Sequence, residues 1–123
     1  MLKLPDRPLA VSQITITYAD YDTFARATQR TKPYDGGLSP SARAKHPVAY
    51  ITWYEAQAYA EWLKTQTGQS YRLPSAAEQK EALRLEPVQV SEGFQEWTED
   101  SSHRDRGSKG ISFRVVRDLV DGE

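Results

Sequence analysis

A chain of 123 residues has the length of one globular domain that can bury its own hydrophobic core. Sixteen basic and seventeen acidic side chains give a formal net charge of −1, so we expect no nucleic-acid binding. No apolar run approaches the roughly 18 residues that cross a bilayer, so we expect no membrane insertion. Cysteine is absent, which excludes thiolate nucleophiles and cysteine-held metal sites, and no cofactor is expected.

The first part of the chain is predicted to contain a strand, a short helix and a long loop. β-Branched residues over 11–17 favour a strand in which Ile14 and Ile16 share one face. A capping signal followed by apolar residues at helical spacing predicts a helix over residues 18–28. Glycines and prolines then punctuate residues 31–47, which indicates a loop.

The clearest predicted element is a long helix that follows a short strand at residues 48–51. Thr52 and Glu55 form the capping box at its start, since each can satisfy a free backbone N–H of the first turn. Apolar residues recur along it at steps of three and four, which places Trp53 and Leu63 on one stripe. We therefore expect both side chains to be buried.

Three further elements are predicted in the last part of the chain. A second capping box favours a helix over residues 75–85. Residues 94–99 form a short aromatic segment, and alternation predicts a closing strand over residues 111–117. Charge is segregated here, because residues 78–100 hold seven acids and two bases, whereas residues 103–117 hold five bases and one acid. Such polarity is typical of a binding edge or of two solvated segments.

Several segments, in collinear order, resemble the formylglycine-generating enzyme family, also called sulfatase-modifying factors. Residues 46–63 are similar to its P-V-x-x-V-S-W-x-x-A-x-x-Y-x-x-W-L block, and residues 67–78 to T-G-x-x-Y-R-L-P-T-E-A-E. Residues 96–100 resemble W-E-W-T-x-D, and residues 113–117 resemble F-R-V-V-R. The resemblance implies an α+β fold of the C-type-lectin-like class, with two main helices around a small, twisted, mostly antiparallel sheet and much irregular loop.

The departures from the family pattern bear on activity. Its catalytic members use a pair of cysteines near the C-terminus to bind copper, and this chain has none. Only residues 101–110 stand between the W-E-W-T-like segment and the last strand. Because the family's catalytic cysteine pair is missing, we expect a protein that is not an enzyme. We expect residues 1–123 to form one compact domain, either whole or excised from a longer multidomain protein.

The shortened loop supplies the candidate binding site. It occupies the place of the family's substrate groove, and loops on rigid scaffolds commonly carry function. The candidate residues for a ligand or partner are Trp97, His103, Arg104, Arg106 and Lys109. Their basic character favours a partner protein or small ligand of acidic character. A plain solvated loop is the alternative.

Metal binding is not expected, although a calcium site is a weak alternative. The family uses the residue that matches Glu96 as a calcium ligand, and Asp100 lies close to it in the sequence. Calcium needs six to eight oxygen ligands. The family's asparagine ligand and most of the adjoining loop are missing here.

Three functions remain open from the sequence. The first is a non-catalytic ligand- or protein-binding module that serves as an accessory or sensor domain of a bacterial protein. The others are a divergent oxidoreductase that works without cysteine, and a diversified lectin-like ligand-binding protein. Residues 1–5 lack the apolar stretch of a secretory signal, so the cytoplasm is only the default expectation. The oligomeric state stays open.

Overall fold

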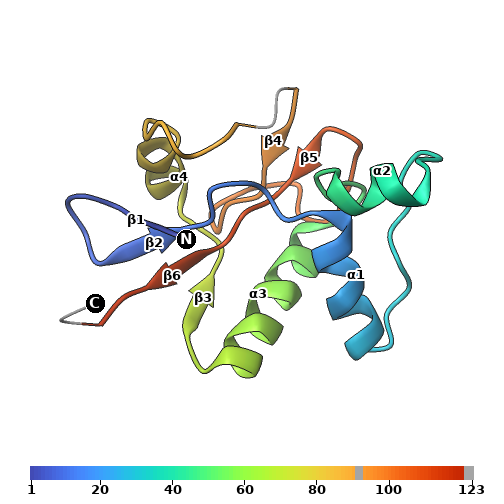
Figure 1. Ribbon diagram of the computed structural model, residues 1–123, viewed down its shortest axis with the longest axis horizontal. Helices are drawn as coiled ribbons and strands as arrows, with labels where there is room; N and C mark the ends of the chain where they lie inside the picture. Colours follow the sequence, from blue (N-terminus) through green and yellow to red (C-terminus); the bar gives the residue numbers. More distant parts are fainter. Residues whose placement is uncertain (91–92, 121–123) are drawn as a thin grey trace.

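The structure, a computed structural model, describes residues 1–90 and 93–120 (Figure 1). This part of the chain forms four helices and six short strands. In chain order they are β1 (Leu2–Lys3), β2 (Leu9–Val11), α1 (Tyr18–Ala27), α2 (Pro40–Lys45), α3 (Trp53–Thr67), β3 (Ser70–Arg72), α4 (Ala76–Ala82), β4 (Gln95–Glu96), β5 (Ile111–Ser112) and β6 (Val116–Asp118). Across the same residues, no helix is both long and apolar enough to cross a bilayer.

The main sheet has the strand order β1-β2-β6-β3, and every neighbouring pair is antiparallel. Val116 of β6 lies opposite Val11 on one side and Arg72 on the other. Strands β4 and β5 form a separate parallel pair, with Gln95 opposite Ile111. Figure 1 shows the main sheet on one side of the molecule and helices α1, α2 and α3 on the other. The predicted α+β fold with a mostly antiparallel sheet is confirmed.

Three helices begin where side chains cap their first turn. In α3, the Thr52 hydroxyl accepts a hydrogen bond from the Glu55 N–H, and the Glu55 carboxylate accepts one from the Thr52 N–H. Helices α1 and α4 carry the same reciprocal box. Gly68 ends α3 with a φ of 71°, the left-handed conformation that glycine adopts at least cost. The predicted starts of these helices are confirmed.

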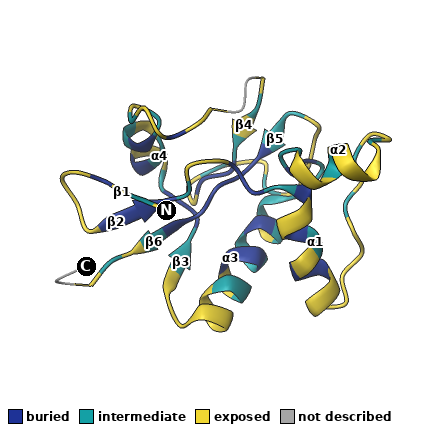
Figure 2. Ribbon diagram, in the orientation of Figure 1, coloured by how far each residue is buried: buried dark blue, intermediate teal, exposed yellow. Residues whose placement is uncertain are grey.

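Helices α1 and α3 pack against each other through aromatic rings. The Phe24 ring lies 5.1 Å from that of Tyr21 and 5.5 Å from that of Tyr59, both in edge-to-face contact. Tyr59 in turn meets Phe113, which precedes β6, at 5.4 Å. These rings are buried, as Figure 2 shows for the inner faces of both helices. Desolvation in this core raises the pKa of the Tyr59 and Tyr21 hydroxyls.

The buried face of α3 is shorter than predicted. Trp53 and Leu63, expected to be buried, are only partly buried and lie at the two ends of the contact with the core. The middle of the stripe, Ala56, Tyr59 and Ala60, is buried.

The predicted strand over residues 11–17 is wrong beyond Val11. Strand β2 ends there, and Ile14 is 47% exposed whereas Ile16 is 7% exposed, so the two do not share a buried face. The Arg114 guanidinium takes the backbone oxygens of Ser12 and Gln13, at 3.0 and 3.3 Å. A side chain thus occupies acceptors that a neighbouring strand would use.

Residues 31–51 also differ from the prediction. The loop contains helix α2, which Ser39 caps and in which Pro40 occupies the first position, a favourable place for proline. Residues 48–51 do not form a strand, because Tyr50 has a φ of 58° and so interrupts the extended backbone.

The closing segment is two strands rather than one. Strand β5 pairs with β4 and strand β6 pairs with β2 and β3, so the chain passes from one sheet to the other between Ser112 and Val116. Helix α4 ends at Ala82, earlier than predicted, and a turn follows in which the Leu85 N–H donates to the Ala82 oxygen. Strands β1 and β3 were not predicted, and each is an edge of the main sheet.

An ion-pair network joins β3, α4 and β6. The Arg72 guanidinium contacts both carboxylate oxygens of Glu78, at 2.7 and 2.8 Å, and both of Asp118, at 2.9 Å. Arg7 lies 3.1 Å from Glu81 and 3.8 Å from Glu78. We refer to these five residues as the Arg72 network.

Candidate functional site

The loop at residues 101–110 is bound to the segment that leads into α3. The Tyr50 N–H donates to the Ser108 oxygen at 3.0 Å, and the Trp53 N–H donates to the Arg104 oxygen at 2.9 Å. Between these bonds, Gly107 lies so close that a Cβ there would sit 2.8 Å from the Ile51 backbone. These backbone contacts fix the position of the loop, although most of its side chains are exposed. We refer to residues 101–110 as the held loop.

Two tryptophan side chains join the segment that leads into α3 to residues 97–98, just before the loop. The Trp97 indole N–H donates to the Ile51 oxygen at 3.1 Å, and the Trp53 indole N–H donates to the Thr98 oxygen at 2.8 Å. Trp97 is buried. Each indole therefore crosses from one segment to the other and satisfies a backbone oxygen there, which fixes the separation of the two segments.

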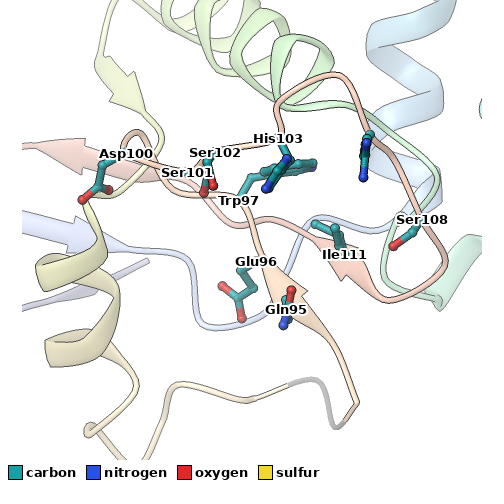
Figure 3. Close-up of a pocket in the computed structure, with 10 residues that line it drawn as sticks. Gln95, Glu96, Trp97, Asp100, Ser101, Ser102, His103, Ser108 and Ile111 are labelled. Carbon is teal, nitrogen blue, oxygen red and sulfur yellow. The ribbon is translucent and has the colours of Figure 1, made fainter.

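A pocket of about 580 Å³ opens between the small β4–β5 pair and the held loop (Figure 3). Its polar lining includes Gln95 of β4 and three serine hydroxyls of the loop, together with His103 and Arg106. Trp97 and Ile111 supply its apolar surface. The serines are Ser101, Ser102 and Ser108.

One lining residue of the pocket, Glu96, is in a buried ion pair with Arg114. The Arg114 guanidinium contacts both carboxylate oxygens of Glu96, at 2.6 and 2.9 Å, and also donates to the Gln89 oxygen at 2.7 Å. The Arg114 side chain is 0% exposed and that of Glu96 is 4% exposed. Glu96 is therefore neutralised where it lines the pocket. The sequence signal for this pair is an arginine between the apolar residues Phe113 and Val115 of a predicted strand.

Asp100 lies at the edge of the pocket beside α4 (Figure 3). Its carboxylate accepts a hydrogen bond of 2.9 Å from the Ala76 N–H in the first turn of that helix. This bond lowers the pKa of the Asp100 carboxyl, so the group is ionised at neutral pH.

These contacts bear on the calcium alternative. A calcium ion at Glu96 would have to displace Arg114, and one at Asp100 would compete with the Ala76 N–H. Within residues 1–90 and 93–120, no three His, Asp or Glu side chains are grouped as metal ligands would be. The absence of a metal remains a prediction.

The structure brings together only part of the predicted site. Trp97, His103 and Arg106 line the pocket, whereas Arg104 and Lys109 do not. The Arg104 guanidinium lies 3.9 Å from the Trp53 ring centroid and donates to the backbone oxygens of residues 99 and 101. Arg104 thus stabilises the loop, and Lys109 is exposed outside the pocket.

The pocket is suited to hydrogen bonding and to contact with one negative group. In the part of the chain that the structure describes, Arg106 is in no ion pair of 4.0 Å or less. His103, which has a left-handed φ of 53°, also lines the pocket. The sequence did not identify Gln95, Ile111 or the three serines as lining residues. For Gln95 and Ile111, nothing in their sequence positions indicates that β4 and β5 pair.

Comparisons with known proteins agree on the fold. The family described as "Sulfatase-modifying factor enzyme 1-like domain" matches residues 3–93. Among solved structures, PvdO from Pseudomonas aeruginosa is similar with a TM-score of 0.67 and 16% sequence identity, over 90% of this chain and 80% of that one. No curated protein sequence matches the chain. Gln95 and every pocket residue after it lie beyond the matched range.

Proposed function

The chain belongs to the family of sulfatase-modifying factor enzyme 1-like domains, and from that premise we propose that it is a non-catalytic binding module. The catalytic members that it resembles depend on a pair of cysteines, and no cysteine occurs in this sequence. The thiolate is the metal ligand in that chemistry, and this sequence supplies none.

The observation that carries the proposal is the held loop beside a pocket. The hydrogen bonds at Tyr50 and Trp53, and the close approach of Gly107, order the loop in the free protein. A surface that is already ordered loses little conformational entropy when a ligand binds. Such preorganisation supports a binding role for the pocket.

The lining supports a polar ligand or partner segment that carries an acidic group. Glu96 and Asp100 already have partners, whereas the Arg106 guanidinium is available to a carboxylate. Guanidinium binds a carboxylate through two parallel hydrogen bonds, which adds specificity as well as energy. The serine hydroxyls and the His103 imidazole would complete the contacts. We propose an accessory or sensor domain that recognises such a group.

A peptide titration tests the binding role. The probes are a blocked peptide, Gly-Glu-Glu-Gly, and its uncharged counterpart, Gly-Gln-Gln-Gly, added to isotope-labelled protein and followed by NMR. We expect the acidic peptide to shift amide signals of residues 95–111, and Arg106→Gln to weaken binding about tenfold, or about 1.4 kcal/mol.

Lys109→Gln is the matched control, because Lys109 is in the same loop but does not line the pocket. It should bind the acidic peptide as the parent does. Equal shifts with both peptides, or equal weakening by both substitutions, would contradict the proposal. So would saturable binding that leaves residues 95–111 unshifted.

A turnover assay tests the non-catalytic part. Purified protein is incubated with copper and a cysteine-containing sulfatase peptide, and formylglycine is measured by mass spectrometry. We expect no product, because the sequence supplies no thiolate. Formation of formylglycine at a rate that depends on this protein would overturn it.

A further inference from the structure

A second hollow is lined by residues of α1, of α2 and of the segment that joins them. Figure 1 shows where these elements lie in the fold. Its volume is about 580 Å³, and it shares no lining residue with the pocket beside the held loop. Leu38 and Pro40 form part of its apolar wall. Residues 19–44, which span this lining, hold four Lys or Arg side chains and three acids.

The acidic side chains in this hollow already have partners. The Arg43 guanidinium contacts both carboxylate oxygens of Asp22, at 2.7 and 3.1 Å, and one oxygen of Asp35, at 2.8 Å. It also lies 4.4 Å from the Tyr18 ring centroid. Hydrogen bonds from Arg43 and from the Gly37 N–H lower the pKa of the Asp35 carboxyl. The three charged groups form a satisfied unit with a net charge of −1.

Two cations in the lining have no such partner. Arg26 comes from the last turn of α1 and Lys32 from the loop after it. Within residues 1–90 and 93–120, neither side chain is in an ion pair of 4.0 Å or less, and both residues are exposed. Together with the unit around Arg43, they leave the hollow with a net charge of +1.

We propose that this hollow binds a small organic carboxylate. The carboxylate would lie between Arg26 and Lys32, the two lining cations that, within the described residues, are in no ion pair of 4.0 Å or less. Guanidinium and carboxylate match in a bidentate pair. The apolar part of the ligand would contact Leu38 and Pro40. A net charge of +1 matches a singly charged carboxylate better than a dianionic phosphate. The Asp22 and Asp35 carboxylates would repel the dianion more strongly.

The experiment compares benzoate with benzamide, an uncharged molecule of almost the same shape, by NMR titration of labelled protein. We expect benzoate to saturate at millimolar concentration and to shift amide signals of residues 19–44, and benzamide to bind at least about tenfold more weakly. Raising the salt to about 150 mM should weaken benzoate binding, because the site is exposed to screening. Equal binding of the two molecules would overturn the proposal, and so would no binding.

Variants then locate the site. Arg26→Gln and Lys32→Gln should each weaken benzoate binding about fivefold, since each removes one charged donor. Lys45→Gln is the control, because Lys45 lies on α2 but does not line the hollow. If Lys45→Gln weakens benzoate binding as much as the other two substitutions, the attraction comes from the overall positive charge and not from this hollow, and the proposal is wrong. Phenyl phosphate binding more tightly than benzoate would overturn the choice of ligand.

Dispersed amide spectra of each variant establish that it is folded. The benzoate and benzamide comparison needs no variant, so the proposal can fail on the parent protein alone. Shifts confined to residues 95–111 would assign the carboxylate to the first pocket, and would contradict this second site while leaving the proposed binding module in place.

Discussion

Two arginine-centred regions hold this fold in different ways. Arg114 and Glu96 form a single pair that is closed to solvent beneath the pocket. The Arg72 network lies at the rim of the main sheet, where the Arg72 side chain is 30% exposed and that of Asp118 is 49% exposed. Both regions use bidentate contacts, so their geometry is alike and their surroundings differ.

The comparison shows why equal contact lengths do not imply equal energies. A charge left without its partner in the interior costs several kcal/mol, because no water replaces the lost contact. At the rim, water and neighbouring charges replace it, and measured values fall to about 0–1 kcal/mol. Glu78 lies between these limits, since it is buried and is contacted by Arg72, by Arg7 and by the Ser75 N–H. Four predictions test this ordering.

The largest effect is expected from Arg114→Met. The variant leaves the Glu96 carboxylate buried without a partner and removes the donors to the oxygens of residues 12, 13 and 89. We expect the free energy of unfolding to fall by about 3–5 kcal/mol in urea denaturation. The double variant Arg114→Met with Glu96→Leu should recover part of this loss. A loss below about 1 kcal/mol for the single variant would mean that the buried pair contributes no more stability than an exposed one, and would contradict the comparison.

Acid should reveal the contribution of Glu78. Hydrogen bonds from Arg72 lower the pKa of this carboxyl from 4.5 to about 2. The folded protein then binds fewer protons than the unfolded chain between these two values, so the stabilisation is complete above pH 4.5 and is lost as pH falls towards 2. The difference corresponds to about 3 kcal/mol.

The measurement is chemical denaturation at a series of pH values from neutral to about 2. Glu78→Gln should lower stability at neutral pH and flatten the acid branch of the curve. The Arg114–Glu96 pair offers the contrast in the same experiment, because Glu78→Gln leaves it intact. An acid branch of unchanged slope in the variant would assign the pH dependence to other carboxyls.

A smaller effect is expected from Asp118→Asn at the rim. The carboxylate is about half exposed, so the lost ion pair should cost less than about 1 kcal/mol. That cost should shrink further in high salt, since exposed charges are screened over about 8–10 Å at ordinary ionic strength. Thermal melts at low and high salt measure it. A loss as large as that of Glu78→Gln would mean that the Arg72 network acts as one unit.

No effect is expected from calcium. Glu96 is held by Arg114, and Asp100 accepts from the first turn of α4, so neither carboxylate is free to begin an oxygen cage. Melting temperatures with excess calcium and with chelator should therefore agree. An ion at 100 times its dissociation constant would add about 2.7 kcal/mol, and a shift of that size would contradict both this prediction and the assigned role of Glu96.

The sequence by itself determined the features that depend on neighbours along the chain. The N-cap at Thr17 and the capping boxes at Thr52 and Ser75 are confirmed, because each joins groups only three residues apart. The collinear motifs likewise indicated the family and the α+β fold. Ser39-Pro40 was a local signal of the same kind, and it was overlooked among the loop residues.

Only the tertiary structure decided how distant segments meet. The strand predicted over 111–117 divides because Arg114 reaches residues 12, 89 and 96, which no periodicity in the segment itself reveals. Contacts between distant segments also decide which of the predicted site residues line the pocket. Arg104 and Arg106 look equivalent in the sequence, yet the Trp53 ring lies under one of them and the pocket lies beside the other. Packing between segments far apart in the chain, and not residue type, decides which arginine is free to bind.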